Sequence, residues 1–174
     1  MPGTPLSETS VALPNRPPQA SFPLIAWVAP VLWMVMIAVG STETFSAPHT
    51  IGWLARVLAF MHFNAAQLEF LNHVLRKIGH FSVYGVLSLL LFRACMATLS
   101  ARTPLRPLDR WSARAFALAI AGCMLVAALD EFHQSFVRFR GPSVRDVILD
   151  TFGAVFAQML LIVILYGKRR KSIA

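Results

Sequence analysis

The sequence has little of what soluble enzymes commonly carry. Charged residues make up only 14% of the 174 residues, and there are two cysteines. Cys95 and Cys123 lie among apolar residues without a partner at a metal-type spacing, so we interpret them as small buried hydrophobic residues. The chain also lacks an HExxH motif, a glycine-rich phosphate loop and a serine in a nucleophile elbow. Motifs alone therefore assign no reaction.

Hydrophobic residues, by contrast, make up 56% of the chain, above the roughly 45–50% of soluble domains. They fall in long blocks, which indicates membrane spans. The net charge is +8, and most of the basic excess lies in loops beside the apolar blocks. That placement is typical of an orientation signal and of attraction to anionic lipid headgroups, so we expect membrane lipids and no nucleic acid as partners.

The order of the blocks predicts three segments. Residues 1–21 are proline-rich and predict a disordered leader, residues 22–167 a transmembrane domain, and residues 168–174 a basic cytoplasmic tail. Spans are expected at 22–40, 77–98, 115–129 and 147–166. The first block also has an alternative interpretation as a signal peptide, because Arg16 precedes it and residues 38–40 resemble a cleavage site. Its length and the long leader favour a span.

Residues 51–75 place apolar side chains at helical spacing, with Arg56, His62, Gln67 and Glu69 on other faces. This pattern predicts an amphipathic helix on the membrane surface, and packing of that helix against the spans is the open alternative. The expected fold is therefore all-α: a polytopic membrane bundle of about four transmembrane helices plus an interfacial amphipathic helix.

Lysine and arginine predict the orientation. With both termini and the 100–114 loop on one side, that side holds ten of the sixteen basic residues: Arg16, Arg93, Arg102, Arg106, Arg110, Arg114, Lys168, Arg169, Arg170 and Lys171. The richer side is expected to be cytoplasmic. The sequence thus predicts a multi-pass protein of the bacterial inner membrane with cytoplasmic N- and C-termini.

Ionisable residues gather at the outer ends of the later spans. The charge-free stretches 78–92 and 115–129 each cover about 22 Å, short of a hydrocarbon core of about 30 Å, and Asp150 lies inside the fourth span. Residues of this kind usually face the bundle interior and are functional candidates. Helical spacing aligns His73 with later polar residues of the second span. We predict one site that contains Lys77, His80, Tyr84, Asp130, Glu131, Gln134, Arg140, Asp146 and Asp150. Purely structural ion pairs are the alternative.

Such a set can perform acid–base chemistry, hold a metal or bind an anion. We assign His80 with Glu131 or Asp130 as the catalytic acid–base group. Lys77 and Arg140 would bind an anionic group, and Tyr84 and Gln134, also in the substrate-binding set, would orient these residues. Asp146 and Asp150 complete the substrate-binding set. Metal and other cofactors stay open, as does whether the protein is an enzyme.

Three segments of these residues resemble the VanZ-like family of bacterial membrane proteins. They are 77–87 with its lysine, histidine and tyrosine, 130–136 with an acidic pair before a glutamine, and 140–153 with its arginine, serine, aspartate and glycine pattern. The resemblance covers about residues 24–166. Asp150 departs from it, since that position is often asparagine, and Ala157 stands where a second glycine is common. The family's namesake is associated with resistance to the glycopeptide teicoplanin, and most relatives have no assigned activity.

The resemblance implies fold, membrane location and a shared site rather than a reaction. We expect a site at the outer leaflet that binds or modifies a polar group of a lipid or a lipid-linked envelope precursor, with an effect on glycopeptide susceptibility as one consequence. A non-enzymatic module that acts through a partner or an oligomer is the alternative. A small transporter is favoured least, because transport sites usually lie near the midplane of the membrane.

Overall fold

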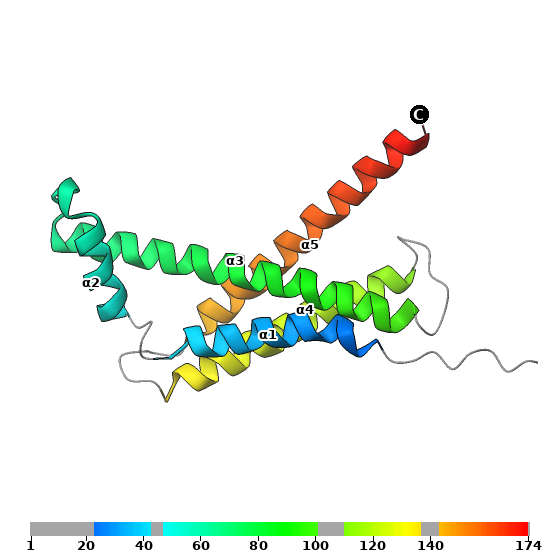
Figure 1. Cartoon of the computed structure of the whole chain (residues 1–174), viewed down its shortest axis with the longest axis horizontal. Helices are drawn as coiled ribbons and strands as arrows, with labels where there is room; N and C mark the ends of the chain where they lie inside the picture. Colours follow the sequence, from blue (N-terminus) through cyan, green and yellow to red (C-terminus); the bar gives the residue numbers. More distant parts are fainter. Residues whose placement is uncertain (1–22, 43–46, 101–109, 137–142, 174) are drawn as a thin grey trace, which may run out of the picture.

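The computed structural model describes residues 23–42, 47–100, 110–136 and 143–173 of the chain (Figure 1). These residues form five α-helices and one 3-10 turn, and they contain no strand. The elements are α1 (Leu24–Gly40), α2 (Ala47–Val57), η2 (Ala59–Met61), α3 (Ala65–Ser100), α4 (Arg110–Gln134) and α5 (Val144–Ile173). The predicted all-α fold is confirmed. The expected leader 1–21 lies outside the described residues.

Three of these helices are long and apolar enough to cross a membrane: α3, the part of α4 from Ala113 to Gln134, and the part of α5 from Val144 to Leu165. The shorter α1 is also apolar, with 17 residues. In Figure 1 these four helices alternate in direction, so that α1 starts, α3 ends and α5 ends at the same side. We call the opposite side, where Gly40, Gln134 and Val144 lie, the cluster end.

The single amphipathic helix expected at 51–75 is wrong in its boundaries. Its residues are divided between α2, η2 and the first turns of α3, and α3 continues without a break past Lys77. His62 ends the 3-10 turn in a left-handed conformation, at φ 54°. Asn64 and Gln67 then start α3 as a reciprocal cap. The Asn64 Oδ1 accepts from the Gln67 N–H at 2.9 Å, and the Gln67 Oε1 accepts from the Asn64 N–H at 2.9 Å.

The connection between α4 and α5 is shorter than the expected spans at 115–129 and 147–166 imply. Helix α4 continues to Gln134 and α5 begins at Val144, so the acidic residues at both ends of this stretch are helical. Ser143 precedes α5, and its carbonyl oxygen accepts the Asp146 N–H at 2.9 Å. The side chains of Asp130 and Asp146 therefore have fixed directions, set by the helices that carry them.

Helices α3 and α5 pack most closely at Gly153. A Cβ atom there would overlap the backbone of Phe81, and a Cβ at Gly85 would lie 3.3 Å from the Gly153 carbonyl oxygen and 3.4 Å from the Ala157 Cβ. The small residues at this crossing let the two helices approach each other closely. The crossing fixes the residues one turn nearer the cluster end, among them Asp150.

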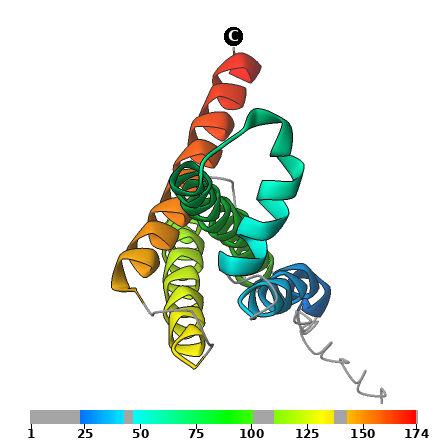
Figure 2. The same cartoon turned by 90° about the vertical axis from the view of Figure 1, so that its left-hand side faces the viewer.

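Helix α1 lies on the other side of α3 from α5 (Figure 2). Two tryptophan side chains attach it. The Trp33 Nε1–H donates to the Val83 carbonyl oxygen at 3.0 Å, and the Trp27 Nε1–H donates to the Thr98 Oγ1 at 3.0 Å. Its other face exposes apolar residues such as Ile25 and Leu32, which suits contact with lipid. Helix α3 is thus the centre of the bundle.

Candidate functional site

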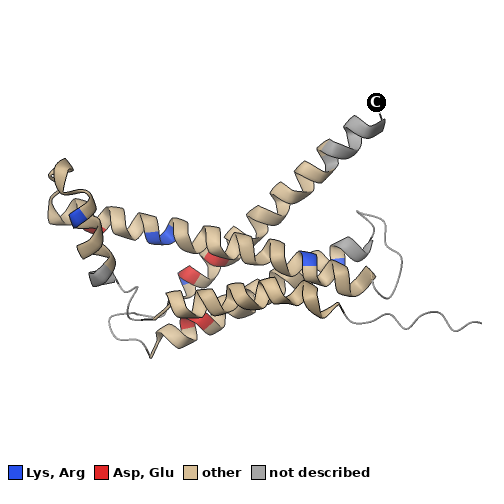
Figure 3. Cartoon of the chain, viewed as in Figure 1, with Lys and Arg blue, Asp and Glu red and all other residues tan. Residues whose placement is uncertain are grey.

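Ionisable side chains from three helices converge at the cluster end. Figure 3 shows the basic pair of α3 close to the acidic residues of α4 and α5. The convergence that helical spacing suggested is therefore present in space for the described members of the set. Arg140 lies outside the described residues.

The contact between α3 and α5 consists of two successive pairs. Lys77 Nζ forms a salt bridge and hydrogen bond with Asp146 Oδ1. One turn deeper, the His80 Nδ1 lies 3.4 Å from the Asp150 Oδ2. Asp150 is fully buried, and its Oδ1 has no hydrogen-bond partner among the described residues. The site is thus anchored on α5 by two carboxylates at different depths.

Helix α4 holds its acidic pair in a different way. The Gln134 Nε2–H donates to the Asp130 Oδ2 at 2.9 Å, within one helical turn. The Glu131 Oε2 accepts the backbone N–H of Ser143 at 2.8 Å, which ties the end of α4 to the start of α5. The Glu131 Oε1 is buried without a partner among the described residues. Glu131 therefore has a structural contact as well as an unused acceptor.

The assignment of His80 with Glu131 or Asp130 as an acid–base group stays a prediction. Among the described residues, the carboxylate within hydrogen-bond distance of His80 is that of Asp150. Asp130 nevertheless lies near enough to interact electrostatically with His80. The physical reason is the close crossing at Gly153, which brings α5 nearer to this part of α3 than α4 comes.

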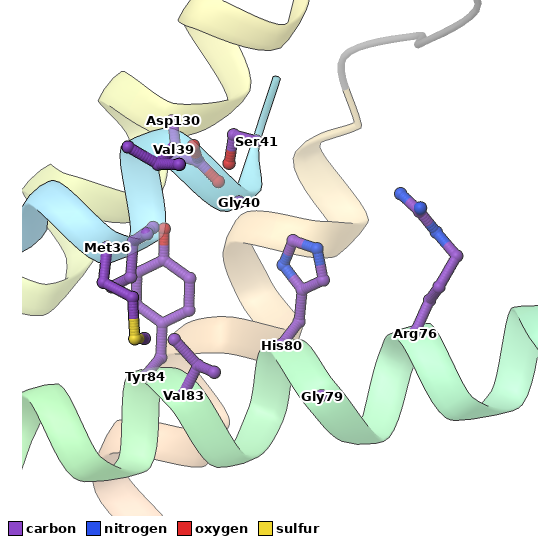
Figure 4. A pocket seen from close by; sticks show the side chains of 11 residues that line it. Met36, Val39, Gly40, Ser41, Arg76, Gly79, His80, Val83, Tyr84 and Asp130 are labelled. Atoms are coloured by element: carbon purple, nitrogen blue, oxygen red, sulfur yellow. The ribbon is translucent and has the colours of Figure 1, made fainter. Parts of the chain in front are cut away.

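A cavity of about 370 Å³ lies between α1, α3 and α4 (Figure 4). Arg76, His80 and Tyr84 line it at successive turns of α3, and Asp130 and Ser41 line the facing side. The remaining lining residues are mostly apolar: Met36, Ile37, Val39, Gly40, Gly79 and Val83. The cavity therefore has an ionisable wall on α3, a carboxylate opposite, and an apolar wall on α1.

Tyr84 occupies the deep end of this cavity. Its ring stacks on His80 with centroids 6.5 Å apart, and only 1% of the residue is exposed. The hydroxyl group points toward Asp130 and makes no hydrogen bond among the described residues (Figure 4). A buried hydroxyl without a partner is energetically costly, so this group is a ready donor for a molecule in the cavity.

The structure divides the predicted site residues into two groups. His80, Tyr84 and Asp130 line the cavity. The remaining described members lie around it and contact one another, backbone or a member of the first group: Lys77, Glu131, Gln134, Asp146 and Asp150. His73 and His133 are exposed. The first group can contact a ligand, and the second positions the first.

Arg76 lines the cavity although it is not among the predicted site residues. A signal was available, since Arg76, His80 and Tyr84 follow a four-residue spacing and so share one helical stripe. Met36, Val39 and Ser41, in α1 and at its end, also line the cavity. The sequence gives no sign of this, because α1 is uniformly apolar and no face of it stands out. Gln158 was also missed. It is fully buried, and its Nε2–H donates to the Ser88 carbonyl oxygen at 2.9 Å in the middle of the α3–α5 contact.

Among the described residues, no group of three or more histidine, cysteine, aspartate or glutamate side chains is arranged to hold a metal ion. What the described arrangement can do is bind a molecule that is polar at one end. A cation on α3, a carboxylate on α4 and an unpartnered hydroxyl between them can recognise complementary charges. The apolar wall on α1 can contact hydrocarbon.

Comparison with known proteins gives one match. The family model described as VanZ/LLP1 matches residues 25–165. This range contains every predicted site residue and all of the cavity lining. None of the curated proteins and none of the solved structures matches the chain.

Proposed function

The chain belongs to the VanZ-like family of membrane proteins, and on that premise we propose that its cavity binds the polar group of a membrane lipid or of a lipid-linked cell-envelope precursor. The observation that supports this function most directly is the lining of the cavity. Arg76, His80, Tyr84 and Asp130 face a space whose other wall is apolar, inside a bundle of membrane-spanning helices. A soluble polar metabolite would gain nothing from contact with the apolar α1 wall. An amphiphile can contact both the ionisable wall and the apolar wall.

The depth of the cavity supports a lipid-like ligand. It lies where α1 ends, at Gly40 and Ser41, while the apolar lengths of α3 and α5 continue toward the opposite side. A ligand there would have its polar group near the membrane surface and its hydrocarbon beside α1. Met36 and Val39 line the cavity and are 44% and 55% exposed, so the cavity reaches the lipid-facing surface.

We place the cluster end on the outer side of the bacterial inner membrane. Support comes from the basic residues of the sequence, most of which belong to the opposite side in this topology. Two exposed serines test this orientation: Ser135 at the cluster end and Ser100 at the other. A membrane-impermeant maleimide should label Ser135→Cys in whole cells and should label Ser100→Cys only after lysis. The native Cys95 and Cys123 are buried and provide a low background. The reverse pattern would invert the orientation.

A chemical step on the bound group would use His80 with Asp130 or Glu131. His80 and Asp130 face the cavity, and Glu131 has an unused buried oxygen on the same helix as Asp130. An imidazole and a carboxyl group on facing walls suit proton transfer. His80→Ala and Glu131→Ala, compared at equal protein level, should each alter envelope composition and glycopeptide susceptibility if this step occurs. Unchanged envelopes in both variants would leave binding as the function.

Gly79 offers a direct test of binding. It lines the cavity, and a Cβ atom built there meets no atom within 4 Å. Gly79→Leu should therefore fill the cavity without straining the helix, and it should reduce the lipid that copurifies with the protein, as identified by mass spectrometry. Gly167→Leu makes the same change at an exposed glycine near the far end of α5, and it should retain the lipid. Equal lipid in both variants contradicts the proposal.

A second candidate function, partner binding without catalysis, is favoured by one observation. Trp53, Phe60 and Phe70 are 66%, 73% and 71% exposed on α2, η2 and the first turns of α3. Exposed aromatic side chains of this kind suit a protein interface or the headgroup layer. Replacing all three with serine should leave lipid retention at the cavity unchanged. Loss of a cross-linked partner protein in this variant, with lipid retained, would support the second function over the first.

A further inference from the structure

The two walls of the cavity carry opposite charges. On α3, Arg76 is cationic at any physiological pH and His80 lies one turn away. On the facing side, Asp130 presents a carboxylate next to Ser41 at the end of α1 (Figure 4). A ligand with a single charge could interact favourably with only one wall, whereas a zwitterionic ligand could interact with both. The arrangement therefore favours a ligand with two charges of opposite sign.

The cationic wall suits a phosphate. The planar guanidinium of arginine binds phosphate oxygens in a bidentate manner, and Arg76 lines this wall of the cavity. His80 is held from behind by Asp150 at 3.4 Å. The ring lines the cavity, and its second nitrogen can form a hydrogen bond with an oxygen of the ligand.

The facing wall suits a hydrogen-bond donor with positive charge. Gln134 donates to only one oxygen of Asp130, the Oδ2, and a carboxylate can accept several hydrogen bonds. The Tyr84 hydroxyl points to the same side and lacks a partner among the described residues. An ammonium group, with three donors, can use the Asp130 carboxylate and the Tyr84 oxygen together.

The volume and the apolar wall limit the rest of the ligand. A cavity of about 370 Å³ is at the small end of ligand sites, which span about 300–1,000 Å³. It holds a headgroup and not a whole lipid, so the acyl chains leave past Met36 and Val39 into the membrane. We infer that the cavity selects a lipid whose headgroup carries both a phosphate and a primary amine, as phosphoethanolamine does, with the phosphate at Arg76 and His80 and the amine at Asp130. This selectivity rests on the proposed lipid-binding function.

Three phospholipids that share the phosphate but differ in the rest of the headgroup distinguish the contribution of the amine from that of the phosphate. Phosphatidylethanolamine has the amine, phosphatidylcholine carries the same charge without N–H donors, and phosphatidylglycerol has hydroxyls and no amine. The full chain is purified, exchanged into vesicles that contain the three lipids in equal amounts, re-extracted in detergent, and its retained lipid is quantified by mass spectrometry. We expect phosphatidylethanolamine to be enriched about tenfold over the other two, the effect of one charge-assisted hydrogen bond.

Substitutions on each wall test which headgroup feature that wall recognises. Asp130→Asn should abolish the preference for phosphatidylethanolamine while phospholipid is still retained, and Arg76→Gln should lower retention of all three lipids. Glu69→Gln makes the same acid-to-amide change at an exposed position of α3 away from the cavity, and it should behave like the unmodified protein.

The outcomes distinguish this inference from the function on which it rests. If the unmodified protein retains lipid in a Gly79-dependent manner but in equal proportions, the selectivity is wrong and the lipid site stands. If Gly79→Leu does not change lipid retention, the proposed function itself fails. The comparison of the three lipids on the unmodified protein needs no variant, so it decides the selectivity even if Asp130→Asn does not fold.

Discussion

Helix α3 packs tightly against α5 on one side and borders a cavity beside α1 on the other. Toward α5, the backbones approach so closely that Gly153 has no room for a Cβ atom, and polar side chains pair across the contact from Lys77 down to Gln158. Toward α1, two tryptophan hydrogen bonds hold the helices together beside a cavity of about 370 Å³. His80 belongs to both sides, since it contacts Asp150 and lines the cavity.

The two sides of α3 therefore differ in role: contacts with α5 position the side chains of the site, and the space beside α1 can bind a ligand. In a membrane, polar groups between helices must be satisfied by other parts of the protein. The α5 side meets this requirement with internal pairs such as the Ser88 Oγ–H donating to the Ala154 carbonyl oxygen at 3.0 Å. The α1 side leaves the Tyr84 hydroxyl without a partner among the described residues. We therefore expect substitutions on the α5 side to change stability, and those on the α1 side to change ligand retention.

The largest effect is expected from Gly153→Ala. The new Cβ would overlap the backbone of Phe81, which cannot move as a side-chain tip can, so we expect a loss of about 3 kcal/mol or more in unfolding free energy. Denaturant titration of the detergent-solubilised protein measures it. Gly122→Ala is the matched control, because its Cβ would lie 3.2 Å from the Leu91 Cδ1, the movable end of a side chain. Equal stability of the two variants would refute the close crossing.

The next largest effect concerns the residue shared by both sides. His80→Ala leaves the buried Asp150 without its partner, which should cost about 1–3 kcal/mol. Adding Asp150→Asn removes the carboxylate and should restore most of the stability, measured by the same titration. Lipid retention should stay low in the double variant, because His80 is still missing from the cavity wall. Full recovery of both properties would mean that His80 serves only to pair with Asp150.

A smaller effect is expected deep in the α3–α5 contact. Gln158→Leu removes the hydrogen bond to the Ser88 carbonyl oxygen and also the buried Oε1, which has no partner among the described residues. Hydrogen bonds between membrane helices contribute about 0.6 kcal/mol on average, and the two changes oppose each other, so the net loss should be about that size or less. Met159→Leu, on the exposed face, is the control. A loss of several kcal/mol would assign Gln158 to a larger polar network.

The smallest change in stability is expected on the α1 side. Met36 lines the cavity and is 44% exposed, so Met36→Ala should alter unfolding free energy by no more than about 0.5 kcal/mol. Copurified lipid should nevertheless decrease, because the hydrocarbon loses part of its wall. Val35→Ala, exposed on the same helix and outside the cavity lining, should leave both measurements unchanged. If the two variants lose equal amounts of lipid, the α1 wall is not where the chains lie.

How far the sequence could predict this structure depends on the kind of interaction. The all-α membrane fold follows from long apolar blocks, since only satisfied backbones can cross lipid. The cap at Asn64 and Gln67 was present in the sequence and would have placed the start of α3. The sequence leaves open whether the helix continues through Asp130 and Glu131, because polar residues after an apolar span resemble a loop until their partners, Gln134 and Ser143, are known.

The candidate site could be predicted only as a set of residue types. Helical spacing brings His80 and Tyr84 to one stripe of α3 and Asp146 and Asp150 to one face of α5. It does not say which stripe faces which helix. The pairing of His80 with Asp150 depends on the crossing at Gly153, and the cavity depends on how far α1 stands from α3. Both are tertiary distances, which no local pattern encodes.

The length of α3 gives the molecule a mechanical property. Its 36 residues contain no proline and form one continuous rod of about 54 Å. Helix α2 packs at the N-terminal end of this rod, while Gly153 clamps it partway along, at Phe81. Arg76 and His80 lie on the segment of α3 between these two contacts. Because an unbroken helix is stiff, the two side chains keep a fixed spacing along their wall of the cavity.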